Sequence, residues 1–181
     1  ITWIENMIDS PINGYNWDTK LIYSGDENKV PTLINDMDFR YISVGDIDND
    51  GDLDIVSGSN THNSSATELG HINLYENDGA SDPTWTKTTI DSYIPGYFVE
   101  LADIDSDGDL DIVSASKNPY GTTTYIDWYE NDGAATWTPA FTAADINISA
   151  NVARDLHIAD MDRDGDLDII SASSGDNTIA W

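Results

Sequence analysis

The sequence predicts an all-β protein built from repeats, each a four-stranded antiparallel sheet of the β-propeller type. A nine-residue segment rich in aspartate occurs three times, beginning at Asp46, Asp103 and Asp160, so both intervals are 57 residues. That interval is about the length of one propeller blade. Short segments of alternating apolar residues flank every copy, and no segment shows helical periodicity. About three such repeats predict an incomplete ring, since propellers close with four to eight blades.

The inner strand of each unit is expected directly before the aspartate-rich segment. Apolar residues stand four and two positions before the first aspartate of every copy, which is typical of a strand with one buried face. A small residue then precedes that aspartate, which indicates close packing at this point. The apolar pairs are Ile42 with Val44, Val99 with Leu101, and Leu156 with Ile158.

The second and third strands are predicted from composition and turn residues. The second strand follows the aspartate-rich segment and is rich in β-branched residues, at 53–59, 110–116 and 167–173. The third strand is expected at 72–77 and 126–131, where a following Asp-Gly pair favours a tight turn.

The fourth, outermost strand has the weakest signal. It is expected at 84–90 and at 136–141, where the polar composition and Pro139 are typical of an edge strand. The stretch 143–153 contains two isoleucines and two asparagines without helical periodicity, and it is predicted to be a loop.

The two ends of the chain resemble parts of the same unit. Residues 1–6 match a third strand and 17–22 a fourth strand, and 178–181 begin another third strand. We therefore expect one repeat domain over residues 1–181. Its parts are strands three and four of a preceding blade with a long loop (1–39), two blades (40–96 and 97–153), and the first strands of another (154–181).

The aspartate-rich segment has the chemistry of a hard-cation site. Calcium takes six to eight oxygen ligands and tolerates irregular geometry. Positions 1, 3, 5 and 9 are Asp in every copy, and position 6 is Gly, where a sharp turn with positive φ is expected. Position 7, also Asp, is predicted to offer its main-chain oxygen. We therefore predict three calcium sites, formed by Asp46, Asp48, Asp50, Asp52 and Asp54; by Asp103, Asp105, Asp107, Asp109 and Asp111; and by Asp160, Asp162, Asp164, Asp166 and Asp168.

Other interpretations of this segment fit less well. An EF-hand loop begins in the same way but needs flanking helices and a bidentate Glu at position 12, where this chain has Ser57, Ser114 and Ser171. Magnesium is a weaker candidate because five carboxylates crowd a small octahedral ion. Zinc would lack its usual Cys and His ligands. Acidic turns that merely face solvent are the simplest alternative, but they would not repeat at a fixed interval.

The composition excludes several classes of partner. The chain has 34 acidic and 7 basic residues, for a formal net charge of −27. Nucleic acid requires basic surfaces, so it is not an expected partner, and neither is an anionic membrane. Fifteen of the 34 acids lie in the three segments, so the acidity is mostly local. No apolar run reaches the length of a membrane span, so membrane insertion is not expected.

The remaining composition says less. There is no cysteine, so the fold needs neither disulfides nor a thiolate metal site. No signal peptide is visible. The chain begins with Ile1 rather than Met, which indicates processing or a longer parent chain.

The chain resembles the FG-GAP/VCBS repeat family, which is related to the blades of the integrin α-subunit propeller. The resemblance rests on the Asp-x-Asp-x-Asp-Gly-Asp-Leu-Asp segments, the Ile-Val-Ser or Ile-Ile-Ser that follows, and the Tyr-Glu-Asn-Asp-Gly of the third strand. It implies propeller blades with a structural calcium ion in the loop between the first two strands. It also implies secreted or cell-surface proteins that bind glycans or proteins, and sometimes propeller domains of polysaccharide-degrading enzymes.

The number of repeats departs from the family pattern. Propellers of this family usually close with about seven blades, whereas this chain has about three repeats. An open stack of blades exposes sheet faces that repeat proteins normally cover. We therefore expect contact with further blades or with other copies of the chain.

The resemblance also implies a ligand face opposite the calcium loops. The connections there are 23–39, 59–70, 91–97, 116–124 and 145–153. Arg40, Tyr97 and Arg154 stand at equivalent positions at the entry to the inner strand, where they are candidates for binding a sugar or an acidic group. Blade packing and charge balance are the alternative explanation for these three residues.

The expected function is a calcium-binding, secreted or cell-surface module for adhesion, with a glycan or a cell-surface protein as partner. The alternatives are a structural subunit of an extracellular assembly and an accessory propeller of a secreted polysaccharide-degrading enzyme. The chain itself is not expected to be an enzyme. His62, His71 and His157 are scattered, and the clustered carboxylates suit metal binding better than glycosidase chemistry.

Overall fold

The computed structural model describes residues 2–7, 16–21, 37–61, 70–92, 96–117, 124–133, 143–146 and 151–181. Every regular element in these residues is a β-strand, so the predicted all-β class is confirmed. No helix of a length and hydropathy suited to crossing a membrane occurs among them.

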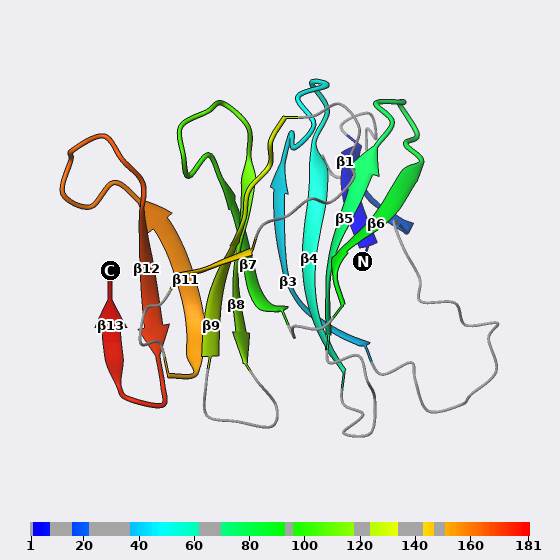
Figure 1. Ribbon diagram of the computed structural model, residues 1–181. Helices are drawn as coiled ribbons and strands as arrows, with labels where there is room; N and C mark the ends of the chain where they lie inside the picture. The colour runs from blue at the N-terminus through cyan, green and yellow to red at the C-terminus, as the bar shows by residue number, and fades with distance from the viewer. Residues whose placement is uncertain are drawn as a thin grey trace.

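The strands form four antiparallel sheets, which are open rather than closed into a ring (Figure 1). β1 (Thr2–Met7) pairs with β2 (Asn16–Leu21). The first blade is β3 (Met37–Gly45), β4 (Asp54–Thr61), β5 (Gly70–Asn77) and β6 (Trp85–Asp91). The second blade is β7 (Gly96–Ala102), β8 (Asp111–Lys117), β9 (Thr124–Tyr129) and β10 (Ala143–Ile146). The third sheet is β11 (Ala153–Ala159), β12 (Asp168–Ser173) and β13 (Thr178–Ala180).

Strand order follows chain order in each sheet, so the units are meanders and fit incomplete propeller blades, as predicted. One element was predicted wrongly. The stretch 143–153 was expected to be a loop, but β10 begins it and pairs with β9, with Ala143 opposite Tyr129 and Ile146 opposite Ile126. An outer edge strand needs only one partner and little burial, so its composition carries a weak signal. The alternative location for this strand, 136–141, lies outside the described residues.

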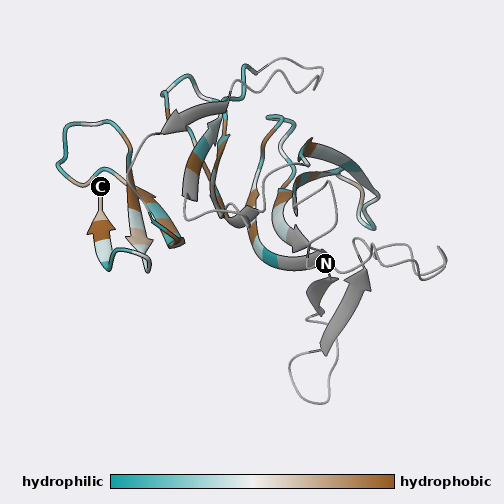
Figure 2. Ribbon diagram, turned by 60° about the horizontal axis from the view of Figure 1, so that its bottom comes forward, coloured by the Kyte–Doolittle hydropathy of each residue, from teal (hydrophilic) through white to brown (hydrophobic). Residues whose placement is uncertain are grey.

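The two blades and the third sheet lie side by side (Figure 2) and pack face to face, and apolar residues lie in both interfaces. We call the face that each sheet turns toward the next sheet its trailing face, and the face toward the preceding sheet its leading face. Between the two blades lie Val56, Ile72 and Leu74 of the first with Val99, Ile112 and Tyr129 of the second. Between the second blade and the third sheet lie Val113, Ala115 and Ile126 with Ala153 and Leu156.

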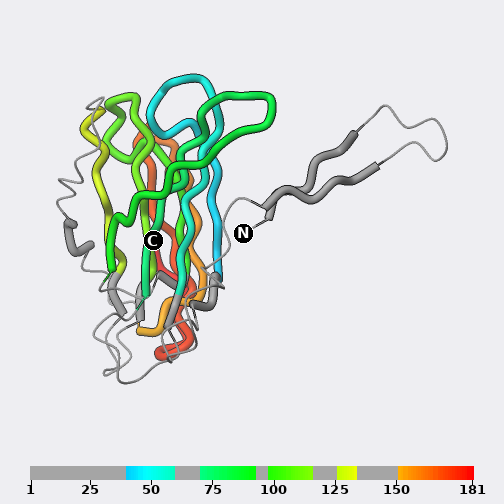
Figure 3. Tube along the Cα trace, turned by 90° about the vertical axis from the view of Figure 1, so that its right-hand side faces the viewer, coloured from blue at the N-terminus to red at the C-terminus, as the bar shows by residue number. Residues whose placement is uncertain are grey.

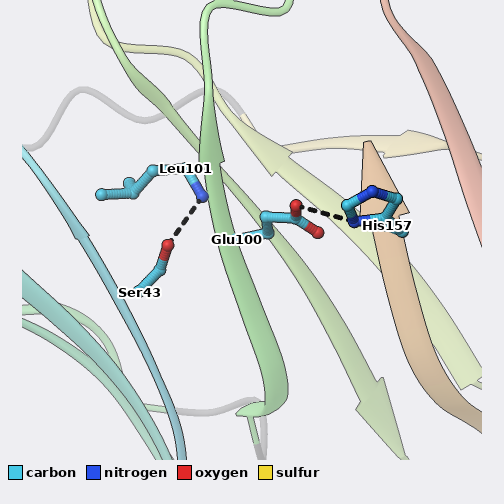
Figure 4. Close-up of polar contacts among 4 residues, drawn as sticks. All are labelled: Ser43, Glu100, Leu101 and His157. Carbon is cyan, nitrogen blue, oxygen red and sulfur yellow. Dashed lines mark hydrogen bonds and ion pairs between the residues drawn. The ribbon is translucent and has the colours of Figure 1, made fainter. Parts of the chain in front are cut away.

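Polar and aromatic contacts also join neighbouring inner strands. The backbone N–H of Leu101 donates to Ser43 Oγ at 3.2 Å, and the rings of Tyr41 and Phe98 lie 4.7 Å apart between centroids. Glu100 Oε1 lies 3.3 Å from His157 Nδ1 (Figure 4). Ser43, Glu100 and His157 stand 57 residues apart, so one register position makes a polar contact with the next sheet in both interfaces.

Burial of the inner strand differs between the repeats. The predicted buried face is confirmed for Val99 and Leu156, both 3% exposed. It is wrong for the first repeat, where Ile42 and Val44 are 54% and 51% exposed. This register is buried by a preceding sheet, and the described residues do not cover the leading face of the first blade.

Candidate metal centre

The three aspartate-rich segments connect the inner strand to the second strand of each sheet. They join β3 to β4, β7 to β8, and β11 to β12, and all three lie at the same end of the molecule (Figure 1). Figure 3 shows the first two of these loops together at that end in a view turned by 90°. We call them loop 1 (46–54), loop 2 (103–111) and loop 3 (160–168).

The backbone of the loops explains the glycine at position 6. Gly51, Gly108 and Gly165 have φ angles of 98°, 102° and 102°, so the predicted positive φ is confirmed. A Cβ added at any of the three would meet no other atom within 4 Å. The backbone angle therefore requires glycine here, and a lack of space does not.

Position 4 also has positive φ, which sequence reasoning missed. The φ angles are 59° at Asn49, 62° at Ser106 and 66° at Arg163. Asparagine tolerates this region, but Ser and Arg adopt it at a cost. The side chains at this position share no property that would have revealed the conformation, and only Asn49 gave a hint.

Three of the five predicted ligands converge in each loop. Carboxylate oxygens of three aspartates lie within 4.8 Å of one another in every cluster. Positions 1, 3 and 5 come together in loops 1 and 2, whereas positions 1, 3 and 9 come together in loop 3. The clusters are Asp46, Asp48 and Asp50; Asp103, Asp105 and Asp107; and Asp160, Asp162 and Asp168.

Backbone N–H groups of the loop hold the carboxylates in place. In loop 1, Gly51 N donates to Asp46 Oδ2 at 3.0 Å, and Asp50 N donates to Asp48 Oδ1 at 3.2 Å. The same bonds recur in the other loops, for example from Gly108 N to Asp103 Oδ2 at 3.1 Å. Each aspartate therefore keeps an oxygen lone pair or a second oxygen for another partner.

One carboxylate oxygen in loop 1 is buried without a hydrogen-bond donor from the part of the chain that the structure describes, which bears on whether a cation fits there. Asp46 Oδ1 is buried and accepts no hydrogen bond from the described residues. A buried carboxylate oxygen without a donor is costly, and a hard cation among carboxylates removes that cost. The residues present therefore suit a cation such as calcium.

Electrostatic repulsion in the loop points the same way. Partial burial, followed by the charges of Asp50 and Asp46, raises the pKa of Asp48 above its usual value. Burial, followed by the charge of Asp48, raises the pKa of Glu76, which lies at the end of β5 beside the loop. A bound cation reverses these effects because it favours the charged carboxylates.

In loops 1 and 2 the aspartate at position 9 is buried and accepts hydrogen bonds from the loop and from near the end of the third strand of the sheet. Asp54 is 1% exposed, and its two oxygens accept hydrogen bonds from Ile47 N at 3.0 Å and Asn77 N at 2.9 Å. Asp111, 0% exposed, accepts the same two bonds from Ile104 N at 3.0 Å and Asn131 N at 2.7 Å. Burial raises the pKa of both carboxyl groups above the usual value.

Loop 3 is less enclosed. Asp168 is half-buried and accepts the bond from Met161 N at 2.8 Å, without a second bond from a third strand among the described residues. Partial desolvation raises the pKa of Asp162 in this loop. The same nine-residue motif therefore occupies three different surroundings.

In loops 1 and 2 the carboxylate at position 7 lies against the turn that follows the third strand, and it is not part of the cluster; that its main-chain oxygen binds a cation stays a prediction. A Cβ added to Gly79 would lie 2.0 Å from Asp52 Oδ2, so the carboxylate of Asp52 rests on that turn. Asp109 rests on Gly133 in the same way, at 2.1 Å. The side-chain amide of Asn49 donates to Asp109 Oδ1, so loop 1 and loop 2 are hydrogen-bonded to each other.

Asn131 is a structural residue of the centre that sequence reasoning missed. Besides its backbone bond to Asp111, its side-chain nitrogen donates to Leu110 O at 3.2 Å and to Ile47 O of loop 1 at 2.9 Å. Its Oδ1 accepts from Gly133 N at 3.1 Å. The signal was present, because the Tyr-Glu-Asn-Asp-Gly run also supplies Asn77 in the first blade. Asn77 makes the equivalent bonds to Leu53 O and from Gly79 N.

The three candidate ligand-binding residues lie at the other end of the inner strands. Arg40, Tyr97 and Arg154 each stand at the register shift of their strand, between Phe39 and Tyr41, between Gly96 and Phe98, and between Ala153 and Asp155. Each is therefore the extra residue of a β-bulge. Arg154 Nε donates to Ser174 Oγ at 3.1 Å. That these residues bind a ligand stays a prediction.

The fold and the loops together define a repeat protein made of β-propeller-like blades with acidic loops at one end. A family model, the FG-GAP-like repeat, matches residues 46–114 and 103–171, which together span more than half of the chain. The chain belongs to the FG-GAP-like repeat family. No curated protein and no solved structure matches it.

Proposed function

We propose that this chain is a calcium-stabilised propeller-type repeat module, in which calcium has a structural function. The observation that carries the proposal is the convergence of three carboxylates in each of the three loops, with their oxygens within 4.8 Å. The orphaned Oδ1 of Asp46 adds to it. The loops connect hydrogen-bonded strands of antiparallel sheets and lack the flanking helices of an EF-hand, which favours a structural ion over a conformational sensor.

Simple magnitudes support a stabilising function. Two carboxylates about 4 Å apart repel by about 4 kcal/mol at an effective dielectric constant of 20. A ligand present at about 100 times its dissociation constant adds about 2.7 kcal/mol per site to the free energy of unfolding. Three sites then add about 8 kcal/mol, which is comparable to the whole stability of an ordinary domain.

Calcium titration followed by calorimetry tests the proposal. We expect three calcium ions to bind per chain and the melting temperature in millimolar calcium to exceed that in EGTA by many degrees. Asp46→Ala, Asp103→Ala and Asp160→Ala should each reduce the stoichiometry by one. Asp176→Ala, at an exposed acidic residue outside the loops, is the matched control and should leave it unchanged.

Two results would overturn the proposal. One is a melting curve in EGTA that superimposes on the curve in calcium. The other is the same binding in the three loop variants as in the unsubstituted chain. Magnesium at equal concentration should stabilise the chain less, because the small octahedral ion accommodates crowded carboxylates poorly.

A second part of the proposal concerns the opposite end of the blades. We propose that the module serves adhesion, by binding a glycan or a protein, with Arg40, Tyr97 and Arg154 as contact residues. The favouring observation is that each of them is the extra residue of a β-bulge in equivalent inner strands. Bulges redirect side chains and occur often beside binding sites.

The same proposal places the chain outside the cell or at its surface, where calcium is abundant. A structural subunit of an extracellular assembly and an accessory propeller of a polysaccharide-degrading enzyme are the alternatives. A glycan array with the calcium-loaded chain separates them. Binding that Arg40→Ala and Arg154→Ala weaken supports adhesion, whereas no binding at high protein concentration favours the structural subunit. Turnover of a polysaccharide by the chain alone would contradict its assignment as a non-enzyme.

A further inference from the structure

The two outer faces of the stack carry the same residues that are buried inside it. On the leading side, Val99 and Leu101 of the second blade pack against the first blade, and their equivalents Ile42 and Val44 are 54% and 51% exposed. On the trailing side, Ile104 and Ile126 of the second blade pack against the third sheet. Their equivalents in the third sheet, Met161 and Ile179, are 51% and 80% exposed. Ile179 belongs to β13, the strand beside the C-terminus in Figure 1.

The interface between the two blades shows how a trailing face meets a leading face. A Cβ added at Gly45 would lie 4.0 Å from Leu101 Cβ, so these two positions are directly apposed. Residue 45 is equivalent to Ala159 of the third sheet, and residue 101 is equivalent to Val44 of the first blade. If a second copy placed its leading face on the third sheet in this geometry, its Val44 would meet Ala159.

Polar groups at the same two faces are complementary as well. Asn49 of loop 1 donates to Asp109 of loop 2, and the equivalents of this pair across two copies are Arg163 and Asp52. Arg163 is exposed, and the carboxylate of Asp52 lies on Gly79 as that of Asp109 lies on Gly133. If two copies met in this geometry, an ion pair between Arg163 and Asp52 would stand where Asn49 and Asp109 form a hydrogen bond inside the chain.

We propose that copies of this chain associate head to tail, with the leading face of the first blade of one copy on the trailing face of the third sheet of another. Each exposed leading face is thus covered by the trailing face of a second copy, and each exposed trailing face by a leading face. The interface is heterologous, so it builds a ring if the rotation closes and a filament if it does not. The net charge of −27 opposes association, and about 0.15 M salt screens much of that repulsion.

Cross-linking tests this arrangement directly, because the chain has no cysteine and each introduced thiol is unique. Ala159→Cys and Val44→Cys are prepared as separate proteins, mixed in calcium-containing buffer and oxidised mildly. Since the apposed positions have a Cβ separation of 4.0 Å inside the chain, a disulfide should form readily. We expect a disulfide-linked dimer in the mixture and little of it in either variant alone.

Three controls make the result specific. Ala102→Cys with Ile158→Cys in one chain occupies the equivalent internal positions and should form an intrachain disulfide. Thr86→Cys, at an exposed residue of β6, should not cross-link to Ala159→Cys. Circular dichroism shows whether each variant keeps its sheet structure.

Sedimentation velocity of the unsubstituted chain supplies an independent measurement. The sedimentation coefficient should rise with concentration, and Arg163→Asp should weaken association about tenfold through repulsion with Asp52. Combining Arg163→Asp with Asp52→Arg should restore most of it.

Equal cross-linking in the single variants and the mixture would overturn the proposed geometry. A sedimentation coefficient that stays monomeric up to about millimolar concentration would overturn self-association itself. Neither outcome depends on whether calcium is the bound ion, because calcium binding is measured separately by titration.

Discussion

Loop 1 and loop 3 share every predicted ligand position but differ in what surrounds them. In loop 1, Asp54 is 1% exposed and accepts bonds from Ile47 N and from Asn77 N, and Ile47 O accepts a bond from Asn131 of the next blade. In loop 3, Asp168 is half-buried and accepts one such bond, from Met161 N. The comparison teaches that a repeated motif specifies the loop, whereas the adjoining strands determine how firmly it is held.

The largest expected effect comes from removing the buried carboxylate. Asp54→Ala leaves two backbone N–H groups without their acceptor, each costing about 1–3 kcal/mol, so we expect a loss of about 3 kcal/mol in the free energy of unfolding. Asp168→Ala should cost about 1 kcal/mol, because water replaces its single bond more easily. Urea unfolding in EGTA measures both without a contribution from bound metal. Equal losses would show that the surroundings do not matter.

A smaller difference is expected between the two asparagines. Asn131→Ala removes bonds to Leu110 O and to Ile47 O and the acceptor of Gly133 N, and should cost about 2 kcal/mol. Among the described residues Asn77 makes no equivalent of the bond to Ile47 O, so Asn77→Ala should cost about 1 kcal/mol. The same urea titrations compare them. If Asn77→Ala were the more damaging variant, the hydrogen bond between the blades would contribute little to stability.

The smallest effect is expected at position 4 of the loops. Ser106 has a φ of 62°, which glycine adopts without strain, so Ser106→Gly should stabilise the chain by about 0.5 kcal/mol. Asn49→Gly, at a φ of 59°, should instead destabilise the chain slightly, because asparagine tolerates this region and the substitution removes its hydrogen bond to Asp109. A shift in melting temperature measured in calcium reports the difference. Destabilisation by Ser106→Gly would mean that the serine side chain contributes more than its backbone strain costs.

Much of the fold followed from local patterns in the sequence. The fixed interval predicted repeated sheets, and the glycine at position 6 predicted a positive φ, because only glycine adopts that angle freely. Ile42 was predicted to be buried, yet the alternation of apolar residues does not say whether a neighbouring sheet is present. β10 was missed because an edge strand makes few contacts that select its residues.

The candidate site was likewise predictable only where its features depend on local sequence. Convergence of the aspartates at positions 1 and 3 in every loop follows from residue type and spacing alone. The hydrogen bond from Asn131 to loop 1 could not be predicted in this way, because its acceptor lies in another blade. The contact of Asn49 with Asp109 likewise depends on how two loops stack, and one copy of the motif holds no information on that.

The hydrogen bond from Asn131 to Ile47 joins residues that are 84 positions apart, so it can form only well after Ile47 has been synthesised. Ribosomes add about 5–20 residues per second, so loop 1 leaves the ribosome several seconds before the asparagine that ties it down. During that interval loop 1 can form with its two flanking strands, but the hydrogen bond from Asn131 is still absent. The second blade thus completes the loop of the blade made before it.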